Sequence, residues 1–348
     1  MLREHGLLYP GARGGDQFVA SIDLRGLDDA KFDHFNAAGA WDRMADEVRA
    51  FDGNAVISHE TFARASGRQL ERIVDSFDTS DLRIVLTVRD LGRQIPAVWQ
   101  ETLKNRAKGS YSQFLADIFV NTDAGPHKFF WKPQDIARLV RRWIQQVGAD
   151  RITLVTVPQT GAPRDELWNR FARGIELPDV PIELPEMAAN SSLGPAEAEL
   201  LRHVNASLPA DFPWPRYIKT VKRQFAETKL AGRDGGRIVV PPEWHDAVKQ
   251  RSTEMVAYLE QSGVAVVGDL NDLTPALPVS DVPGPDDLSS DELMRVSAEV
   301  LRDYLLAPPP APRRPAPVAP APAPPPSWFR ARARAWRDRV RRRLRRAG

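Results

Sequence analysis

The chain contains no cysteine, and this absence excludes several kinds of site. Without a thiol there is no disulfide bond, thiolate zinc site, iron–sulfur cluster or cysteine nucleophile. No stretch approaches about 18 consecutive apolar residues, so no membrane-spanning helix is predicted. The opening residues, Met1 to Gly6, lack the apolar core of a secretory signal. Together these absences predict a cytoplasmic protein.

Common catalytic signatures are also missing. The sequence has no G-x-G-x-x-G, G-x-x-x-x-G-K-[ST], G-x-S-x-G or H-E-x-x-H pattern. His59 and Glu60 begin the last of these, but Ala63 stands where the second histidine is required. The six histidines show no metal-ligand spacing, so we expect no metal cofactor.

The net charge of +2 conceals two regions of opposite sign. Residues 307–348 contain 12 arginines and one aspartate, which gives +11 and leaves −9 for residues 1–306. Eleven prolines at 307–326 predict an extended linker. Residues 327–348 carry ten arginines around a stripe of apolar side chains, which predicts a basic amphipathic helix. We expect its partner to be an anionic membrane surface or, as an alternative, nucleic acid or an acidic protein. A further alternative is a disordered tail that only keeps the protein in solution.

The rest of the chain alternates apolar, β-branched runs with amphipathic stretches. Strands are predicted at 54–58, 82–88, 151–157 and 264–267. Helices are predicted at 41–51, 66–77, 92–107, 111–119, 133–147, 194–207, 214–230 and 241–262. This order predicts an α/β fold with a parallel sheet flanked by helices. We expect one domain at 1–275, mostly helical over 173–275, then an acidic segment with a short helix at 276–306.

Polar residues follow two of the predicted strands, where ligands bind in open parallel sheets. The first strand is followed by Ser58, His59 and Glu60, and the second by Arg89 and Asp90. An arginine beside a helix start suits a phosphate group, and a histidine or carboxylate there suits a general base. The alternatives are a structural ion pair between Arg89 and Asp90, and a loop that is simply solvated. The aromatic residues at 129–131 either line a pocket for an acceptor or pack at an edge.

Several strings, taken together, resemble the bacterial sulfotransferases, a P-loop-like family that uses 3′-phosphoadenosine 5′-phosphosulfate. The resemblance covers most of residues 1–275. It rests on the order and spacing of strings at 56–60 (VISHE), 88–101 (VRDLGRQIPAVWQE), 104–106 (KNR), 190–194 (NSSLG) and 266–270 (VVGDL).

This resemblance implies roles for individual residues. Arg89 would bind the 3′-phosphate of the nucleotide. Ala97 replaces the serine that the family usually has as its partner, and Gln94 or, alternatively, Gln100 would compensate for the missing hydroxyl. Glu60, or alternatively His59, would be the base that deprotonates a hydroxyl or amine acceptor. Lys104 would steady the sulfonate group. The acceptor would be a small molecule, a carbohydrate or a lipid.

The sequence departs from the family at its beginning. The family opens with a strand, a P-K-[ST]-G-[ST]-T loop and a helix, whereas Met1 to Gly11 resemble only the end of that helix. The loop supplies much of the stabilisation of the leaving group, so we expect the 348 residues alone to be inactive and poorly stable. The missing strand would be central and would leave its two neighbours unpaired. The alternative function is a non-catalytic binding protein whose Arg-rich tail engages an anionic membrane or nucleic acid.

Overall fold

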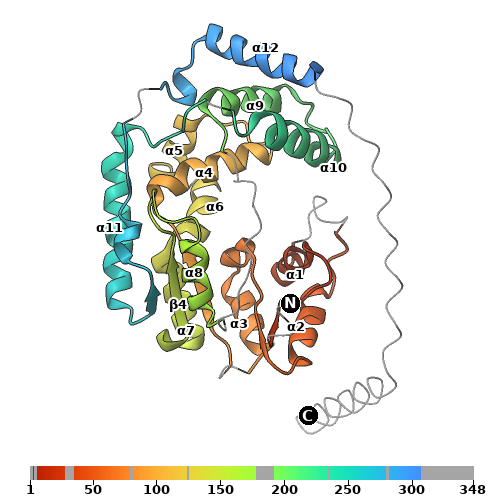
Figure 1. Ribbon diagram of the computed structural model, residues 1–348, viewed down its shortest axis with the longest axis vertical. Helices are drawn as coiled ribbons and strands as arrows, with labels where there is room; N and C mark the ends of the chain where they lie inside the picture. Colours follow the sequence, from red (N-terminus) through yellow and green to blue (C-terminus); the bar gives the residue numbers. More distant parts are fainter. Residues whose placement is uncertain are drawn as a thin grey trace. The chain divides into compact units, whose positions relative to one another are not determined.

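The structure is a computed structural model that describes residues 3, 6–27, 35–78, 81–123, 125–177, 192–233, 235–279 and 282–306 (Figure 1). The chain divides into two units, Met1–Leu305 and Leu306–Gly348. The predicted proline-rich linker at 307–326 and the basic helix at 327–348 lie outside the described residues. The predicted 190–194 string lies outside them in part.

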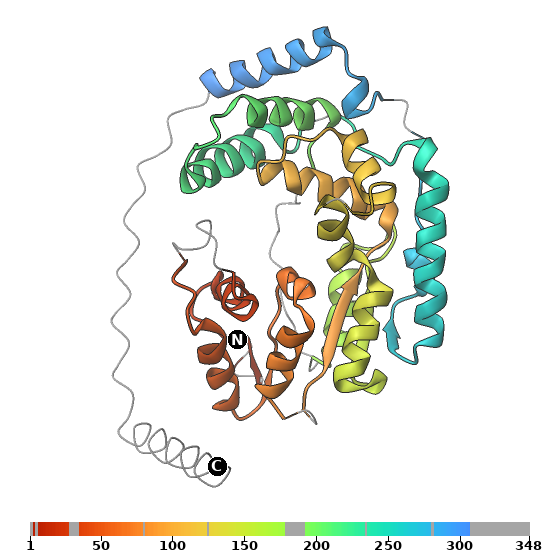
Figure 2. The same ribbon diagram turned by 180° about the vertical axis from the view of Figure 1, so that it is seen from behind.

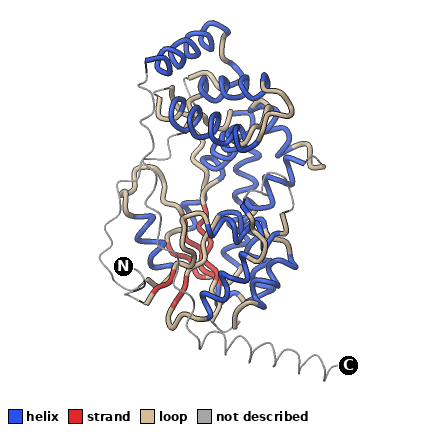
Figure 3. The backbone as a smooth tube through the Cα atoms, turned by 90° about the vertical axis from the view of Figure 1, so that its right-hand side faces the viewer, coloured by secondary structure: helices blue, strands red, loops and turns tan. Residues whose placement is uncertain are grey.

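The strands form two parallel sheets, not one (Figure 3). Strands β1 (Leu7–Leu8) and β2 (Asn54–Ala55) pair with each other. Strands β3 (Ile84–Val88), β4 (Ile152–Thr156) and β5 (Ala265–Val267) form the second sheet in that order. The predicted parallel sheet flanked by helices is confirmed in this coarse form. Strand β2, however, does not join β3 among the described residues.

Strands β1 and β2 can pair because the backbones of Gly6 and Gly53, just before these strands, lie very close together. A side chain at Gly53 would place its Cβ 2.7 Å from the carbonyl oxygen of Gly6, so only glycine lets the two segments meet. The Val56 N–H then donates to the Leu8 carbonyl at 2.8 Å. Residues 1–11 were compared with the end of a helix and its exit, and within them Leu7 and Leu8 form a buried strand that was not predicted.

Strands β3 and β4 pair directly along all five residues, from Ile84 with Ile152 to Val88 with Thr156. Within the described residues, β4 is therefore central and β3 has a partner on one edge only. Ile152, Leu154 and Val155 of β4 are fully buried, as expected of a central parallel strand.

Helices α7 (Ile136–Val147) and α8 (Glu166–Gly174) both contact β4 (Figure 2). A Cβ at Gly174 would lie 2.6 Å from a methyl carbon of Val155, which shows how closely α8 packs on the strand. The predicted apolar stripe of α7 is buried at four of its five positions, and Ile144 is partly buried. The predicted helix α7 and the unpredicted helix α8 therefore both pack on β4.

Helix α4 (Leu91–Lys104) follows β3 directly and carries the residues of main interest. Leu91, Ile95, Trp99 and Leu103 recur every four residues and are all nearly or fully buried, which fixes the face that α4 turns to the core. Asp90 caps its N-terminus by accepting a hydrogen bond from the Arg93 N–H at 3.0 Å.

The remaining elements complete the first unit. The α-helices are α1 (Asp16–Arg25), α2 (Ala40–Arg49), α3 (Gly67–Asp75), α5 (Tyr111–Phe119), α6 (Gly125–Gln134), α9 (Pro195–Ser207), α10 (Trp214–Tyr217), α11 (His245–Gln261) and α12 (Ser290–Leu306). The helix predicted at 214–230 becomes α10 followed by the π-helix η5 (Ile218–Leu230). The 3₁₀ helices are η3 (Glu60–Arg64), η4 (Ala149–Arg151), η6 (Pro242–Trp244), η7 (Leu270–Leu273) and η8 (Pro285–Asp287). Helices α1, α6 and α8 were not predicted.

Candidate functional site

The carboxyl end of β3 is built around a buried ion pair between Asp90 and Arg93. The Asp90 side chain is completely buried, and its carboxylate binds both the backbone N–H and the guanidinium of Arg93. Arg93 also donates to the carbonyls of Pro158 at 2.8 Å and Val157 at 3.3 Å. This arginine therefore ties the end of β3 to the segment that follows β4. The sequence had suggested Arg89 as the partner of Asp90, and the structure gives that place to Arg93.

Arg89 is consequently left without a partner. Its side chain is half-buried, and its Nε is buried with no hydrogen bond within the described part of the chain. Burial lowers the pKa of Arg89, and the nearby Arg93 charge lowers it further, while Asp90 opposes both. A buried N–H without an acceptor is costly, so this guanidinium is poised to bind an anion.

Gln94 and Lys104 lie at opposite ends of α4. Gln94 is in the first turn, close to Arg89 in sequence, and its backbone N–H donates to the Asp90 carbonyl at 3.1 Å. Lys104 is the last residue of the helix, ten residues on, which corresponds to about 15 Å along the axis. Gln94 therefore lies in the first turn after Arg89 and Asp90, and Lys104 lies at the other end of the helix.

The two candidate bases lie at the start of η3. His59 caps this short helix, with its Nδ1 2.7 Å from the Thr61 hydroxyl and 3.2 Å from the Thr61 N–H. Its ring lies 5.2 Å from that of Phe18. Glu60 points to solvent with a side chain that is 89% exposed, 3.9 Å from the Nε2 of His59. No hydrogen bond or ion pair of the described residues links either base to Arg89.

A network at the carboxyl end of β4 was missed in the sequence. Thr156 donates from its hydroxyl to Asp272 at 2.7 Å and accepts from Arg170 at 2.9 Å. Arg170 also pairs with Asp272 and, at 2.6 Å, with Glu166. Burial alone would raise the pKa of Asp272, but the hydrogen bonds from Thr156 and Arg170 lower it. The sequence feature that could have indicated this network is the pair Gly268–Asp269, which follows β5 and precedes Asp272 by a few residues.

Gly268 is part of this network because its backbone has a positive φ of 108° and lies against Thr156. A Cβ at this position would stand 2.0 Å from the Thr156 hydroxyl oxygen. Each charged side chain of this network pairs with another of its members. The network therefore stabilises the fold, and none of its described charges is left unpaired for a ligand.

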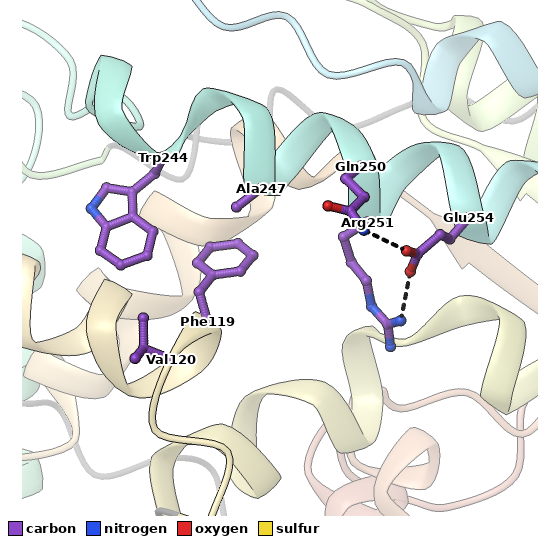
Figure 4. Close-up of a pocket in the computed structure, with 7 residues that line it drawn as sticks. All are labelled: Phe119, Val120, Trp244, Ala247, Gln250, Arg251 and Glu254. Atoms are coloured by element: carbon purple, nitrogen blue, oxygen red, sulfur yellow. Dashed lines mark hydrogen bonds and ion pairs between the residues drawn. The ribbon is translucent and has the colours of Figure 1, made fainter.

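An open groove of about 310 Å³ lies between the end of α5 and α11 (Figure 4). Its lining residues are Phe119, Val120, Trp244, Ala247, Gln250, Arg251 and Glu254. The rings of Phe119 and Trp244 stack at 5.5 Å at one end. At the other end Arg251 pairs with Asp135 at 2.7 Å and Glu254 at 3.1 Å. Because its charges are already paired, the groove presents mainly an apolar surface.

Within the described residues, no group of three or more His, Asp or Glu side chains is arranged to hold a metal ion. The same residues include no helix with the length and apolar character needed to cross a membrane. Comparison of the chain with protein-family models, with curated proteins and with solved structures gave no match.

Proposed function

We propose that the chain is a sulfotransferase-like protein with a P-loop-like fold that binds 3′-phosphoadenosine 5′-phosphosulfate at the carboxyl end of β3. The observation that carries this proposal is Arg89, whose buried Nε has no hydrogen-bond acceptor among the described residues. A phosphate group fits this requirement, because it supplies several acceptor oxygens and a negative charge. Gln94, one turn into α4, would donate its side-chain amide to the same nucleotide.

The reaction would transfer the sulfonate group to a hydroxyl or amine. The acceptor oxygen or nitrogen forms a bond to sulfur while the bond from sulfur to the phosphate oxygen breaks, which leaves adenosine 3′,5′-bisphosphate. Glu60 or His59 would take the proton that the acceptor loses. Lys104, the last residue of α4, would steady the sulfonate group, as the resemblance implies.

The second candidate is a protein that binds the nucleotide without transfer. Glu60 favours it, since its side chain is 89% exposed and no described contact connects it with Arg89. In this version the Arg-rich tail at 327–348 would bring the protein to an anionic membrane or nucleic acid. Deletion of 327–348 would then abolish salt-sensitive binding to vesicles that contain phosphatidylserine.

Calorimetric titration of the full chain with adenosine 3′,5′-bisphosphate tests the shared part of both candidates. Arg89→Met should weaken binding at least about tenfold, or 1.4 kcal/mol. Arg83→Met is the matched control, since it removes the same charge at the other end of β3, where Arg83 forms an exposed pair with Glu176. If the unchanged chain does not bind, or if both variants bind equally well, the proposal is wrong.

Turnover separates the two candidates. Because the 348 residues alone are expected to be inactive, a form of the chain with a P-K-[ST]-G-[ST]-T loop restored would be incubated with the sulfonate donor and either 2-naphthol or 2-naphthylamine, and the sulfated product measured. A transferase should lose about 100-fold in rate in Glu60→Gln or in His59→Gln, whichever residue is the base. Binding without any product from either acceptor would favour the non-catalytic candidate.

A further inference from the structure

Five basic side chains from four different elements gather around the turn that follows η3. They are Arg25 at the end of α1, Arg64 at the end of η3, Lys132 in α6, and Arg138 and Arg142 in α7, hereafter the cationic cluster. Burial lowers the pKa of Lys132, and the charges of Arg25, Arg142, Arg64 and Arg138 all lower it further. The five side chains are therefore near enough to repel one another.

Two hydrogen bonds hold the centre of the cationic cluster in place. Arg64 donates to the Phe129 carbonyl at 2.9 Å, and its guanidinium carbon lies 3.9 Å from the centre of the Phe129 ring. Arg142 donates to the carbonyl of Ala65, the residue next to Arg64. The Arg64 guanidinium is thus fixed against α6, and the Arg142 guanidinium against the turn that follows Arg64.

Helical spacing brings the outer members of the cationic cluster toward this centre. Lys132 follows Phe129 by three residues, which is close to one turn of α6. Arg138 precedes Arg142 by four residues, so the two side chains share one face of α7. Helices α6 and α7 contact each other, and η3 contacts both α1 and α6.

The cationic cluster lacks acidic partners among the described residues. None of its five side chains forms an ion pair there, although most other buried or half-buried arginines of this unit do. Burial and the Arg25 charge lower the pKa of Arg64 to about 10. The Glu60 charge offsets only part of this lowering, because the Glu60 side chain is 89% exposed. Repulsion between like charges at this spacing makes the free energy of folding less favourable, so an external anion that binds among them would stabilise the fold.

The nitrogen atoms of the cationic cluster are largely unused. Arg64 and Arg142 each commit one terminal nitrogen to a backbone carbonyl, and Arg25, Lys132 and Arg138 make no side-chain hydrogen bond within the described residues. The free edges of the Arg64 and Arg142 guanidinium groups can each bind two oxygen atoms of one tetrahedral anion. Phe129, which is 52% exposed, adds an apolar surface beside them.

We propose that the cationic cluster is a binding site for a soluble ligand that carries a phosphate-ester or sulfate-ester group. A compact ligand is favoured over an extended polyanion because four of the five cations are half-buried and converge on one turn, and only Arg138 is exposed. The site stands independently of Arg89, since no described contact joins it to the carboxyl end of β3.

Amine labelling of the full chain tests the proposal at the site itself. Lys132 would be acetylated in the presence of inorganic pyrophosphate or of sodium sulfate, at an ionic strength kept constant with sodium chloride, and its rate compared with that of exposed Lys219. Pyrophosphate should slow labelling of Lys132 about tenfold at saturation, because the anion covers the amine and raises its pKa, and should leave Lys219 unchanged. This internal reference removes the contribution of the Arg-rich tail.

A charge-matched pair of variants checks which residues bind the anion. Arg25→Gln with Arg138→Gln removes two cations that make no side-chain hydrogen bond, and Arg223→Gln with Lys229→Gln removes two from η5. The first double variant should need about tenfold more pyrophosphate for half-protection of Lys132, and the second should behave as the unchanged chain. Thermal melting of both verifies that they fold.

The outcomes are distinct. Protection by sulfate as well as by pyrophosphate assigns a site for a single tetrahedral anion, and protection by pyrophosphate alone assigns a diphosphate. Equal slowing at Lys132 and Lys219, no slowing at either, or equal behaviour of the two double variants would each overturn the proposal. The labelling result on the unchanged chain decides the matter even if a variant fails to fold.

Discussion

Arg170 and Arg64 are both withdrawn from solvent, but they stand in opposite electrostatic surroundings. Burial would lower the pKa of Arg170, yet its hydrogen bonds to Glu166 and Asp272 raise it. Arg64 has no such carboxylate partner, and its pKa falls to about 10. We call the Arg170 network closed, because its charged side chains pair with one another. We call the cationic cluster open, because its side chains form no ion pair among the described residues. The comparison separates arginines that hold the fold together from arginines that are available to an anion.

The largest effect should come from breaking the closed network with Arg170→Met. This change leaves Asp272 with a buried charge and no cation, so we expect a loss of about 3 kcal/mol in the free energy of unfolding. Urea denaturation of the full chain measures it. Arg64→Met in the open cluster should cost clearly less, since it removes repulsion along with one hydrogen bond. Equal losses in both variants would erase the distinction between the two regions.

The closed network should also make the free energy of unfolding depend on pH in the acid range. The pKa of Asp272 is lower in the folded state than in the unfolded state, so its charge stabilises the fold above about pH 4, the ordinary pKa of aspartate. This contribution is lost as the pH falls from there through the folded-state pKa. Arg170→Met removes one cause of the lowered pKa and should flatten this part of the profile. An unchanged slope in that variant would show that Asp272 does not titrate with the network.

A carboxylate placed in the open cluster should stabilise the protein. Arg138→Glu replaces a repulsion with an attraction to Arg142, four residues along α7, for a gain of about 0.5 kcal/mol. Arg138→Gln removes only the repulsion and should fall between this variant and the unchanged chain. Urea denaturation at low and high salt measures both gains, which salt should diminish. A loss of stability in either variant would mean that the cluster is already neutralised in solution.

The smallest effect should come from Glu60→Gln. Glu60 partly offsets the lowered pKa of Arg64, but it is 89% exposed, and exposed pairs contribute roughly 0.2–0.5 kcal/mol. We therefore expect a small loss of stability that disappears when Arg64 is also replaced by Met. A double-mutant cycle provides the measurement, and two additive losses would show that Glu60 and Arg64 do not interact.

Strong periodicity made parts of the fold predictable. Helices α4 and α7 have apolar residues at helical spacing, and β3 and β4 are continuous β-branched runs, so each was predicted to within a few residues. Helix α6 was missed, because Gly125 and two prolines argued against a helix there. The separate pairing of β1 with β2 was also missed, since two-residue strands have no pattern to recognise.

The site was predictable only where one local segment forms it. Arg89 was identified because it follows a strand and precedes a helix. That it has no partner among the described residues depends on the ion pair between Asp90 and Arg93. That pairing follows from the geometry of a helix start, where a capping residue meets the residue three places on. The cationic cluster joins residues 25, 64, 132, 138 and 142, and only tertiary contacts bring such distant positions together.

Gly268 gives the closed network a consequence for how this sequence can diverge. With no room for a methyl group beside the Thr156 hydroxyl and the Arg170 guanidinium, the glycine cannot be replaced while both neighbours are in place. The order of substitutions is therefore constrained: positions 156 and 170 must change first, and each change alone leaves Asp272 poorly partnered. Descendants of this chain are expected to retain all four residues or to have exchanged them together, which would make them a lineage marker.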